Sequence, residues 1–307
     1  MSVKISVIIV SYNVRELIIQ CLQSIFKSKE SWDIEVIVVD NHSSDDSLFQ
    51  IKRLYPQVHL IENKQNVGFS EANNQGLRVA NGTFIFLLNP DTEIFENTLA
   101  LLKLHLENHP QTGIVVPRLL NSDMSIQESA WKDARLRDLF LDLFFLHTIY
   151  KVKAHPVEGY VVPTEIETAS GAALFFRRDL PEKIGELDKN LFWMEDVDFC
   201  YRARKVGNIV YLPEAHVIHH SGKSTKTDFR IPISNQIISK IKFFKKHDSY
   251  LTFSSAVLLS YLNVLSRIVL FLTLSPFQKL AKQKLYAYVY TFSKLNRYVF
   301  LNVQNVV

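Results

Sequence analysis

Cysteine is scarce in this sequence, and the two residues present, Cys21 and Cys200, each lie in a helix-like pattern. Their small number excludes a disulfide-rich scaffold and a zinc site built from cysteines, and it fits a reducing cytoplasm. A secretory signal is also missing, since one lysine and then a strand-like run open the chain without a small-residue cleavage site. We therefore expect a cytoplasmic protein.

Glycine-rich phosphate loops are absent as well. The chain has neither the GxGxxG pattern of dinucleotide-binding proteins nor the GxxxxGK[ST] pattern of P-loop proteins. These absences argue against a dinucleotide-dependent oxidoreductase and against a P-loop NTPase.

Acidic residues are nearly missing from the end of the chain. From Ser221 onward there are 13 Lys and Arg against 2 Asp and Glu, a net charge of +11, whereas the preceding part carries −7. Such a division is typical of a basic tail that meets an anionic surface, either a membrane or a nucleic acid. No RNA- or DNA-binding motif accompanies the tail, so we expect a membrane partner and no nucleic acid.

The chain does contain a regular alternation of apolar strands and helical patterns. With 47% hydrophobic residues over 307 positions, it can bury a full core. Continuous apolar strands between helices indicate a parallel sheet covered on both faces, with right-handed crossovers. The expected strands are 5–10, 34–40, 58–62 and 83–88, and the expected helices are 14–27, 44–54 and 70–80.

The middle of the chain continues this α/β pattern. Its last helical element begins in three acids and ends in bases and a glycine, as the helix dipole prefers. We expect helices at 96–108, 136–150 and 193–207, strands at 114–116, 168–178, 208–213 and 216–222, and a loop at 154–163.

Polar residues follow the first four strands at their carboxyl ends, where parallel sheets bind ligands. Pro90, between Asn89 and Asp91, restricts the direction in which the chain leaves the fourth strand. An ordinary strand-to-loop turn is the alternative, because Asn, Pro and Asp are common turn residues. The polar strand ends are Ser11 and Asn13, Asp40, the segment 63–70, and Asn89 with Asp91.

Seven motifs, taken in order, resemble the family 2 inverting glycosyltransferases of the GT-A fold, and most of all their rhamnosyltransferase-like branch. They are VSYN, VVDN, NVGFS, LLNPD, SGAALFFRR, MEDVDFCYRARKVG and HVIHHSG. The resemblance spans residues 3–225 and leaves the tail outside. It implies a mostly parallel nucleotide-binding sheet flanked by helices, with a GT-A catalytic domain at 1–225. From its own charge and apolar pattern, we expect the remainder, 226–307, to form a basic, amphipathic helical region.

The resemblance also implies a metal site at Asp91. A divalent cation with hard oxygen ligands, Mg²⁺ or Mn²⁺, would stabilise the diphosphate leaving group of a sugar nucleotide. In the family this position ends an Asp-x-Asp motif, but here Asn89 replaces the first acid and contributes no charge. A histidine at the position of His219 completes the metal or diphosphate site in the family, and a structural histidine is the alternative.

For the nucleotide, the resemblance points to the other strand ends. Asp40 would accept the N3–H of uracil or thymine, or else it forms an Asx turn or helix cap. Ser11 and Asn13 would contact the nucleotide, or else they cap the following helix. The loop residues Asn66, Gly68 and Phe69 would lie at the nucleotide and the donor sugar.

Inversion requires a base that takes the proton of the acceptor hydroxyl. The resemblance assigns this role to Asp196, and Glu195 would position acceptor hydroxyls. In the alternative interpretation, both acids and Asp198 are helix-start charges that favour the positive end of the helix dipole.

The tail contains a long apolar segment at 251–275 and a basic segment after Pro276. On a helix the polar residues of 251–275 form one stripe, which favours a helix in the membrane interface; a transmembrane helix would place Arg267 at high cost in the bilayer. The basic stripe favours an anionic membrane surface, with a helical cap or an oligomer contact as the alternatives. The polar stripe is Thr252, Ser255, Ser260, Asn263, Ser266 and Arg267, and the basic stripe is Lys279, Lys282, Lys294 and Arg297.

We therefore predict an inverting glycosyltransferase that moves a sugar from a pyrimidine nucleotide, dTDP-rhamnose or a UDP-sugar, to a saccharide or lipid-linked acceptor of cell-surface polysaccharide synthesis. It would work on the inner face of the cell membrane. A non-catalytic sugar-nucleotide-binding homologue is one alternative, because Asn89 replaces an acid. A nucleotidyltransferase is the other, although VSYNVREL at 10–17 is not the glycine-rich, basic triphosphate loop that it would need.

Overall fold

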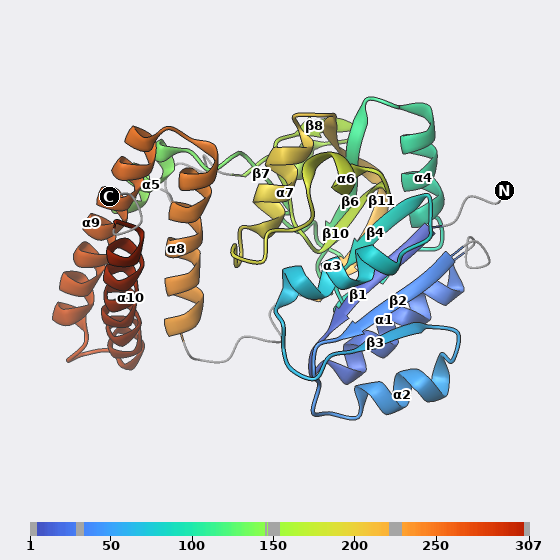
Figure 1. Cartoon of the computed structure of the whole chain (residues 1–307), viewed down its shortest axis with the longest axis horizontal. Coiled ribbons are helices and arrows are strands. Elements are labelled where there is room, and N and C mark those ends of the chain that lie inside the picture. Colours follow the sequence, from blue (N-terminus) through green and yellow to red (C-terminus); the bar gives the residue numbers. More distant parts are fainter. Residues whose placement is uncertain (1–4, 29–33, 145, 147–153, 221–228, 304–307) are drawn as a thin grey trace. The chain divides into compact units, whose positions relative to one another are not determined.

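The computed structural model describes residues 5–28, 34–144, 146, 154–220 and 229–303. The chain divides into two compact units, which we treat separately (Figure 1). The sheet unit comprises 1–133, 154–189 and 195–221, and the helical unit comprises 134–153, 190–194 and 222–307.

One large mixed sheet forms the centre of the sheet unit. Its strand order is β3-β2-β1-β4-β10-β6-β11-β5, with β8 beside β11, and β7 and β9 form a separate pair. The strands are β1 (Ile5–Ser11), β2 (Ile34–Asp40), β3 (His59–Glu62), β4 (Phe84–Leu88), β5 (Thr92–Ile94), β6 (Thr112–Leu120), β7 (Ala130–Trp131), β8 (Thr164–Ile166), β9 (Thr168–Ala169), β10 (Ala173–Arg177) and β11 (Asn208–His219).

The first four strands run parallel and are confirmed where the sequence predicts them. They alternate with the predicted helices α1 (Arg15–Lys27), α2 (Ser47–Leu54) and α3 (Phe69–Val79), followed by α4 (Thr98–Asn108). Two apolar clusters form the core, one on each face of the sheet. The α1, α2 and α4 side chains belong to one cluster, and those of α3, α6 (Leu180–Ile184) and α7 (Glu195–Ala203) belong to the other.

Close helix–sheet packing explains one glycine. In the middle of α3, a Cβ at Gly76 would collide with the Ile8 side chain of β1. Burial raises the pKa of Cys21 and of Cys200 to about 12, and both thiols are free. Both lie in helices, as expected, and both belong to the core.

The later strands differ from the predicted pattern in three respects. The single strand predicted at 168–178 is wrong, because β9 pairs with β7 and only β10 joins the large sheet. The sheet includes three antiparallel members, because β10 runs against β4 and β6, while β5 and β8 run against β11. The two strands predicted at 208–213 and 216–222 are wrong as separate elements. They form the single strand β11, with a register shift between Leu212 and His216 that accommodates Pro213.

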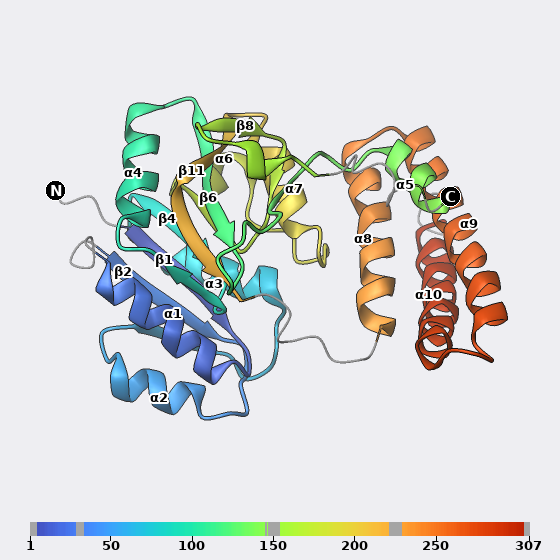
Figure 2. The same cartoon turned by 180° about the vertical axis from the view of Figure 1, so that it is seen from behind.

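The helical unit contains α5 (Leu136–Leu143), α8 (Arg230–His247), α9 (Tyr250–Leu274) and α10 (Lys279–Val303). The last two are long neighbours joined by a short turn at Ser275–Gln278, and Figure 2 shows them side by side from behind. Ile241, Val264 and Leu295 form the core between α8, α9 and α10. The helix predicted at 136–150 ends at Leu143, and 147–150 lie outside the described residues.

Candidate active site

Ser11 and Asp40 are neighbours at the carboxyl edge of the sheet, because they pair in register at the ends of β1 and β2. Both side chains are buried. One Asp40 oxygen, Oδ2, accepts the Ser43 backbone N–H at 2.9 Å, so the predicted Asx-type turn is present. The other oxygen, Oδ1, and the Ser11 hydroxyl have no hydrogen-bond partner among the described residues. Buried acceptors in this state are stabilised when a ligand supplies a donor.

Asn13 connects the loops after β1 and β2. Its Oδ1 accepts the Ser44 backbone N–H at 2.7 Å, and its own N–H donates to Ser43 Oγ at 3.0 Å. It adopts a positive φ of 54°, which asparagine tolerates better than most residues. The helix-cap alternative for Ser11 and Asn13 is wrong, because Val14 occupies the N-cap position of α1 and no side chain caps this helix.

The loop before α3 is held by asparagine side chains. Asn41 accepts the Val67 backbone N–H at 2.9 Å and donates to Asn66 Oδ1 at 2.9 Å. Asn66 Oδ1 also accepts the Gly68 backbone N–H at 2.9 Å. Gly68 has a φ of +87°, where a side chain would be strained. These bonds fix the backbone at the start of α3, which is a suitable place for an anion.

Phe69 has a different surrounding from its neighbours in this loop. Its ring is half-buried and packs against the core cluster that α3 and α7 share. Phe69 therefore packs against the core, and the polar groups of the loop are the Asn66 side chain and the Gly68 backbone.

Asp91, in the turn before β5, lies close to His219, at the end of β11. His219 pairs with Thr92 in the antiparallel register, and its Nε2 lies 3.4 Å from Asp91 Oδ1. Both side chains are partly exposed, 13% for His219 and 22% for Asp91, so a ligand can reach them.

Gln127 orients the His219 ring. Its amide Nε2 donates to Asn121 Oδ1 at 2.8 Å and to the His219 carbonyl at 3.3 Å, which directs Oε1 toward His219 Nδ1 at 2.8 Å. Since Oε1 accepts only, Nδ1 carries a proton. In the neutral ring, Nε2 then presents its lone pair to the Asp91 carboxylate, and two acceptors facing each other favour a cation between them.

The neighbouring histidine belongs to a separate chain of hydrogen bonds. His220 Nε2 lies 2.7 Å from Glu93 Oε1, and its Nδ1 lies 2.8 Å from Ser122 Oγ. The alternation expected for a strand is thus observed, with His219 directed toward Asp91 and His220 toward Glu93.

Asn89 lies between the sheet edge and the acidic motif of α7. Its backbone N–H donates to the Ala172 carbonyl at 2.9 Å, and its side-chain Oδ1 is buried without a partner among the described residues. One residue earlier, the Gly171 N–H donates to Asp196 Oδ2 at 3.0 Å. Asp196 is therefore tied to the segment that also holds Asn89.

Asp196 is half-buried, and desolvation raises its pKa above the ordinary aspartate value. Its second oxygen accepts the Val197 N–H at 2.8 Å. A Cβ at Gly171 would approach the Asp196 Cβ to 3.2 Å, so a larger residue there would push against the carboxylate. The position requires a small residue for steric reasons.

The other two acids of the motif differ in how far their side chains are buried. Asp198 is fully buried and pairs with Arg202 at 2.7 Å, and Arg202 also donates to carbonyls at 184–186. Asp198 also lies in the acidic first turn of α7, as the helix-start interpretation expects. Glu195 remains partly exposed in the first turn of α7.

A preformed metal cage is not present. No group of three or more His, Cys, Asp and Glu side chains that could hold a metal occurs among the described residues. Asp91 and His219 are suitable as two protein ligands, and diphosphate oxygens and waters would have to complete the coordination.

Three contributors to this site were not predicted from the sequence: Asn41, Gln127 and Gly171. Asn41 stands within the VVDN motif, so its place after a strand was a usable signal. Gln127 and Gly171 act through partners 92 and 25 residues away, and no local pattern indicates such contacts.

Comparisons with known proteins show the family to which the chain belongs. Residues 6–184 match the family model "Glycosyl transferase family 2". The chain is 28% identical over 264 residues to "Low-salt glycan biosynthesis hexosyltransferase Agl10" of Haloferax volcanii, covering 83% of this chain and 75% of the relative. It is 26% identical over 214 residues to "N-acetylglucosaminyl-diphospho-decaprenol L-rhamnosyltransferase" of Mycobacterium tuberculosis, covering 64% and 69%.

Solved structures show the same fold. S. aureus TarS 1-349 superposes with a TM-score of 0.53 at 16% identity, covering 96% of this chain and 91% of that chain. GalNAc-T7 with UDP, GalNAc and Mn²⁺ superposes with a TM-score of 0.57 at 17% identity, covering 82% and 56%. These neighbours are GT-A glycosyltransferases, so the predicted fold class is confirmed. The chain belongs to glycosyl transferase family 2 and is a glycosyltransferase of the GT-A fold.

Proposed function

We propose that this enzyme is a hexosyltransferase that uses a uridine or thymidine diphosphate sugar and transfers the sugar with inversion to a saccharide or lipid-linked acceptor. The observation that carries the proposal is the set of unpartnered buried acceptors, Asp40 Oδ1, Ser11 Oγ and Asn89 Oδ1, at the sheet edge of a family 2 enzyme. The relative from Mycobacterium tuberculosis acts, by its name, on a diphospho-decaprenol substrate, which supports a lipid-linked acceptor.

Base selection follows from Asp40. Its Oδ1 is buried and accepts no bond from the described residues, while Oδ2 is held by Ser43. Uracil and thymine carry an N3–H that can donate to this oxygen, whereas N3 of cytosine is an acceptor and would meet the carboxylate unfavourably.

Asp91 and His219 would hold the divalent cation. One carboxylate and one imidazole nitrogen suit Mn²⁺ better than Mg²⁺, which prefers oxygen ligands alone. When bound, the cation neutralises the charge that grows on the departing diphosphate. Asn89 adds a neutral amide near the same turn, so the site carries less negative charge than a pair of aspartates.

Asp196 would act as the base. Its backbone hydrogen bonds from Gly171 and Val197 hold the carboxylate in place, and its raised pKa increases its affinity for a proton. The acceptor oxygen bonds to the anomeric carbon as its proton passes to Asp196. The bond from that carbon to the diphosphate oxygen breaks on the opposite face, which inverts the configuration.

We also propose that the helical unit attaches the enzyme to the cytoplasmic membrane face. Among the described residues, α9 is the one helix with the length and mean hydropathy, 1.9, to cross a bilayer, yet only 17% of its apolar window is buried. Its exposed face is an apolar stripe of Leu251, Leu258, Leu262, Leu265, Val269 and Leu272. Exposed lysines of α10 supply the complementary charge for anionic lipids.

Calorimetry with UDP, dTDP and CDP, each with and without Mn²⁺, tests the donor chemistry. We expect UDP or dTDP to bind more tightly than CDP, and Mn²⁺ to strengthen the preferred complex. Hydrolysis or transfer of the matching sugar nucleotide then distinguishes an enzyme from a protein that only binds the donor. Equal affinity for all three nucleotides would remove Asp40 from base recognition.

A further inference from the structure

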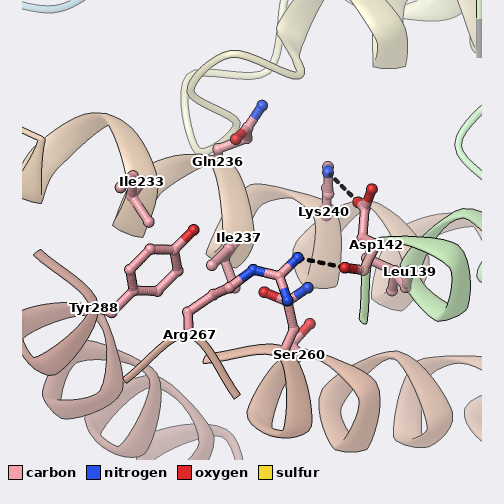
Figure 3. A pocket seen from close by; sticks show the side chains of 10 residues that line it. Leu139, Asp142, Ile233, Gln236, Ile237, Lys240, Ser260, Arg267 and Tyr288 are labelled. Atoms are coloured by element: carbon pink, nitrogen blue, oxygen red, sulfur yellow. Dashed lines mark hydrogen bonds and ion pairs between the residues drawn. The ribbon is translucent and has the colours of Figure 1, made fainter. Parts of the chain in front are cut away.

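The helical unit has a polar cavity inside and an apolar face outside. The cavity, of about 300 Å³, lies between α5, α8, α9 and α10 (Figure 3). Three of the six residues of the polar stripe predicted on α9, namely Ser260, Asn263 and Arg267, line the cavity. Arg267 is only 6% exposed although it is the one charged residue of α9. The opposite side of the same helix is the exposed apolar stripe. In a water-soluble bundle, a helix would instead expose its polar face and bury its apolar face.

The cavity has an excess of positive charge. Two cations, Arg267 and Lys240, line it together with one carboxylate, Asp142. Lys240 Nζ lies 3.6 Å from Asp142 Oδ2, which is an ion pair longer than a direct hydrogen bond. The Tyr288 side chain and the Gln236 amide add polar groups around the same space.

Arg267 also has a structural contact. Its guanidinium donates to the carbonyl oxygens of Asp142 and Leu143 at the end of α5, which stabilises that helix terminus. Those contacts account for the burial of Arg267. They do not account for the open volume beside it.

We propose that this cavity binds the phosphate or diphosphate group of an isoprenoid lipid, the anchor of the acceptor. The size is at the lower end of ligand sites and suits a head group. A guanidinium and an ammonium in a partly desolvated space bind phosphate oxygens through charge-assisted hydrogen bonds. The hydrocarbon chain then lies in the bilayer that the apolar stripe of α9 contacts. The inference rests on the proposed function, because it gives the lipid-linked acceptor its binding place.

The test uses the full-length protein in EDTA, which withholds the cation from the donor site. Calorimetry compares farnesyl diphosphate with farnesol and with inorganic pyrophosphate. Three variants are compared with the original chain: Lys240→Gln and Arg267→Gln in the cavity, and Lys246→Gln as the matched control. Lys246 is exposed on the same helix as Lys240 and does not line the cavity, and its substitution removes the same charge.

We expect farnesyl diphosphate to bind at least about tenfold more tightly than farnesol, which lacks the diphosphate, and than pyrophosphate, which lacks the hydrocarbon chain. Lys240→Gln and Arg267→Gln should each weaken this binding by about five- to tenfold, and Lys246→Gln should leave it within about twofold. Circular dichroism checks the fold of each variant. If Arg267→Gln fails to fold, Lys240→Gln decides.

Three results would overturn the inference. If folded Lys240→Gln binds farnesyl diphosphate with unchanged affinity, the cavity is not the binding site. Farnesol binding as tightly as the diphosphate indicates an apolar site alone, and pyrophosphate binding as tightly indicates a site for free phosphate. UDP titrated with Mn²⁺ on the same proteins tests the donor chemistry separately, so a failure of the proposed function is recognised independently.

Discussion

At the scale of single residues, the site depends on which oxygen or nitrogen atom is left available. Asp40 uses one oxygen for its turn, and its other oxygen has no partner among the described residues; the Nδ1 proton of His219 is held by Gln127. Asp196 is held by two backbone N–H groups. The role proposed for each of these groups can be tested by a separate measurement.

Asp196→Asn should lower turnover by on the order of a hundredfold or more, because the amide cannot accept the acceptor's proton. Donor binding with Mn²⁺, measured by calorimetry, should stay unchanged. Near-normal transfer by the variant would show that another group, with Glu195 as the first candidate, is the base.

The pH dependence of the original enzyme provides a second readout for Asp196. A base works in its ionised form, so kcat/KM should fall as the pH is lowered through the Asp196 pKa. Burial raises this pKa, and the acidic limb should therefore begin above the ordinary aspartate value of about 3.9. The limb should disappear from the residual activity of Asp196→Asn; its persistence would assign it to another group.

Gln127→Leu should weaken the Mn²⁺ dependence of UDP binding by about tenfold or more, the usual range for losing a partner that orients a metal ligand. Binding of UDP in EDTA should be unaffected, since Gln127 is expected to act through His219, the proposed metal ligand. Ser122→Ala is the matched control, because it removes a partner of His220 instead. Equal effects of the two substitutions would contradict a specific role for Gln127.

At the scale of elements, α7 carries Asp196, the proposed base, and a buried ion pair holds this helix in place. Asp198 has no exposed surface and pairs with Arg202, which also donates to the carbonyls at 184–186 and so connects α7 to α6. The helix that holds Asp196 is thus fixed from its far side.

Asp198→Ala should lower the free energy of unfolding by about 3 kcal/mol or more, because it leaves the Arg202 charge buried without its partner. Denaturant titration followed by circular dichroism measures this loss. Asp179→Ala is a suitable control, since its pair with Lys183 is exposed and should contribute less than about 1 kcal/mol. A loss for Asp198→Ala as small as that of the control would mean that the pair does not hold α7.

At the scale of the whole molecule, charge and apolar surface are divided along the chain. The part from Ser221 onward carries a net +11 and the preceding part −7. The apolar stripe of α9 belongs to the basic part, which supports membrane attachment by apolar insertion together with attraction to anionic lipids.

Leu262→Ser with Leu265→Ser should reduce cosedimentation with anionic vesicles by on the order of tenfold or more, because two exposed leucines no longer insert. Binding of the original chain should also weaken with salt and with neutral lipid. Leu104→Ser, at a leucine that is 54% exposed on α4, is the matched control and should leave binding unchanged. If the double variant and the original chain partition equally, the stripe does not insert into the membrane, and we would interpret it as an oligomer contact.

The sequence alone was sufficient to place the strand ends and the residues that follow them. Continuous apolar runs between helices admit one main arrangement, a parallel sheet, and its carboxyl ends must meet at one edge. Ser11 and Asp40 are register partners for this reason. The periodicity of 251–275 likewise separated polar from apolar residues on one helix.

Only the tertiary structure decided which groups face each other across long loops. Gln127 meets His219 across 92 residues, and Gly171 meets Asp196, because strand register and helix packing bring them together. It also decided that Ser260, Asn263 and Arg267 of the polar stripe of α9 line a cavity while the apolar stripe stays exposed. Helical periodicity defines two faces but does not determine which one is buried, since that depends on the surfaces that the neighbouring helices present.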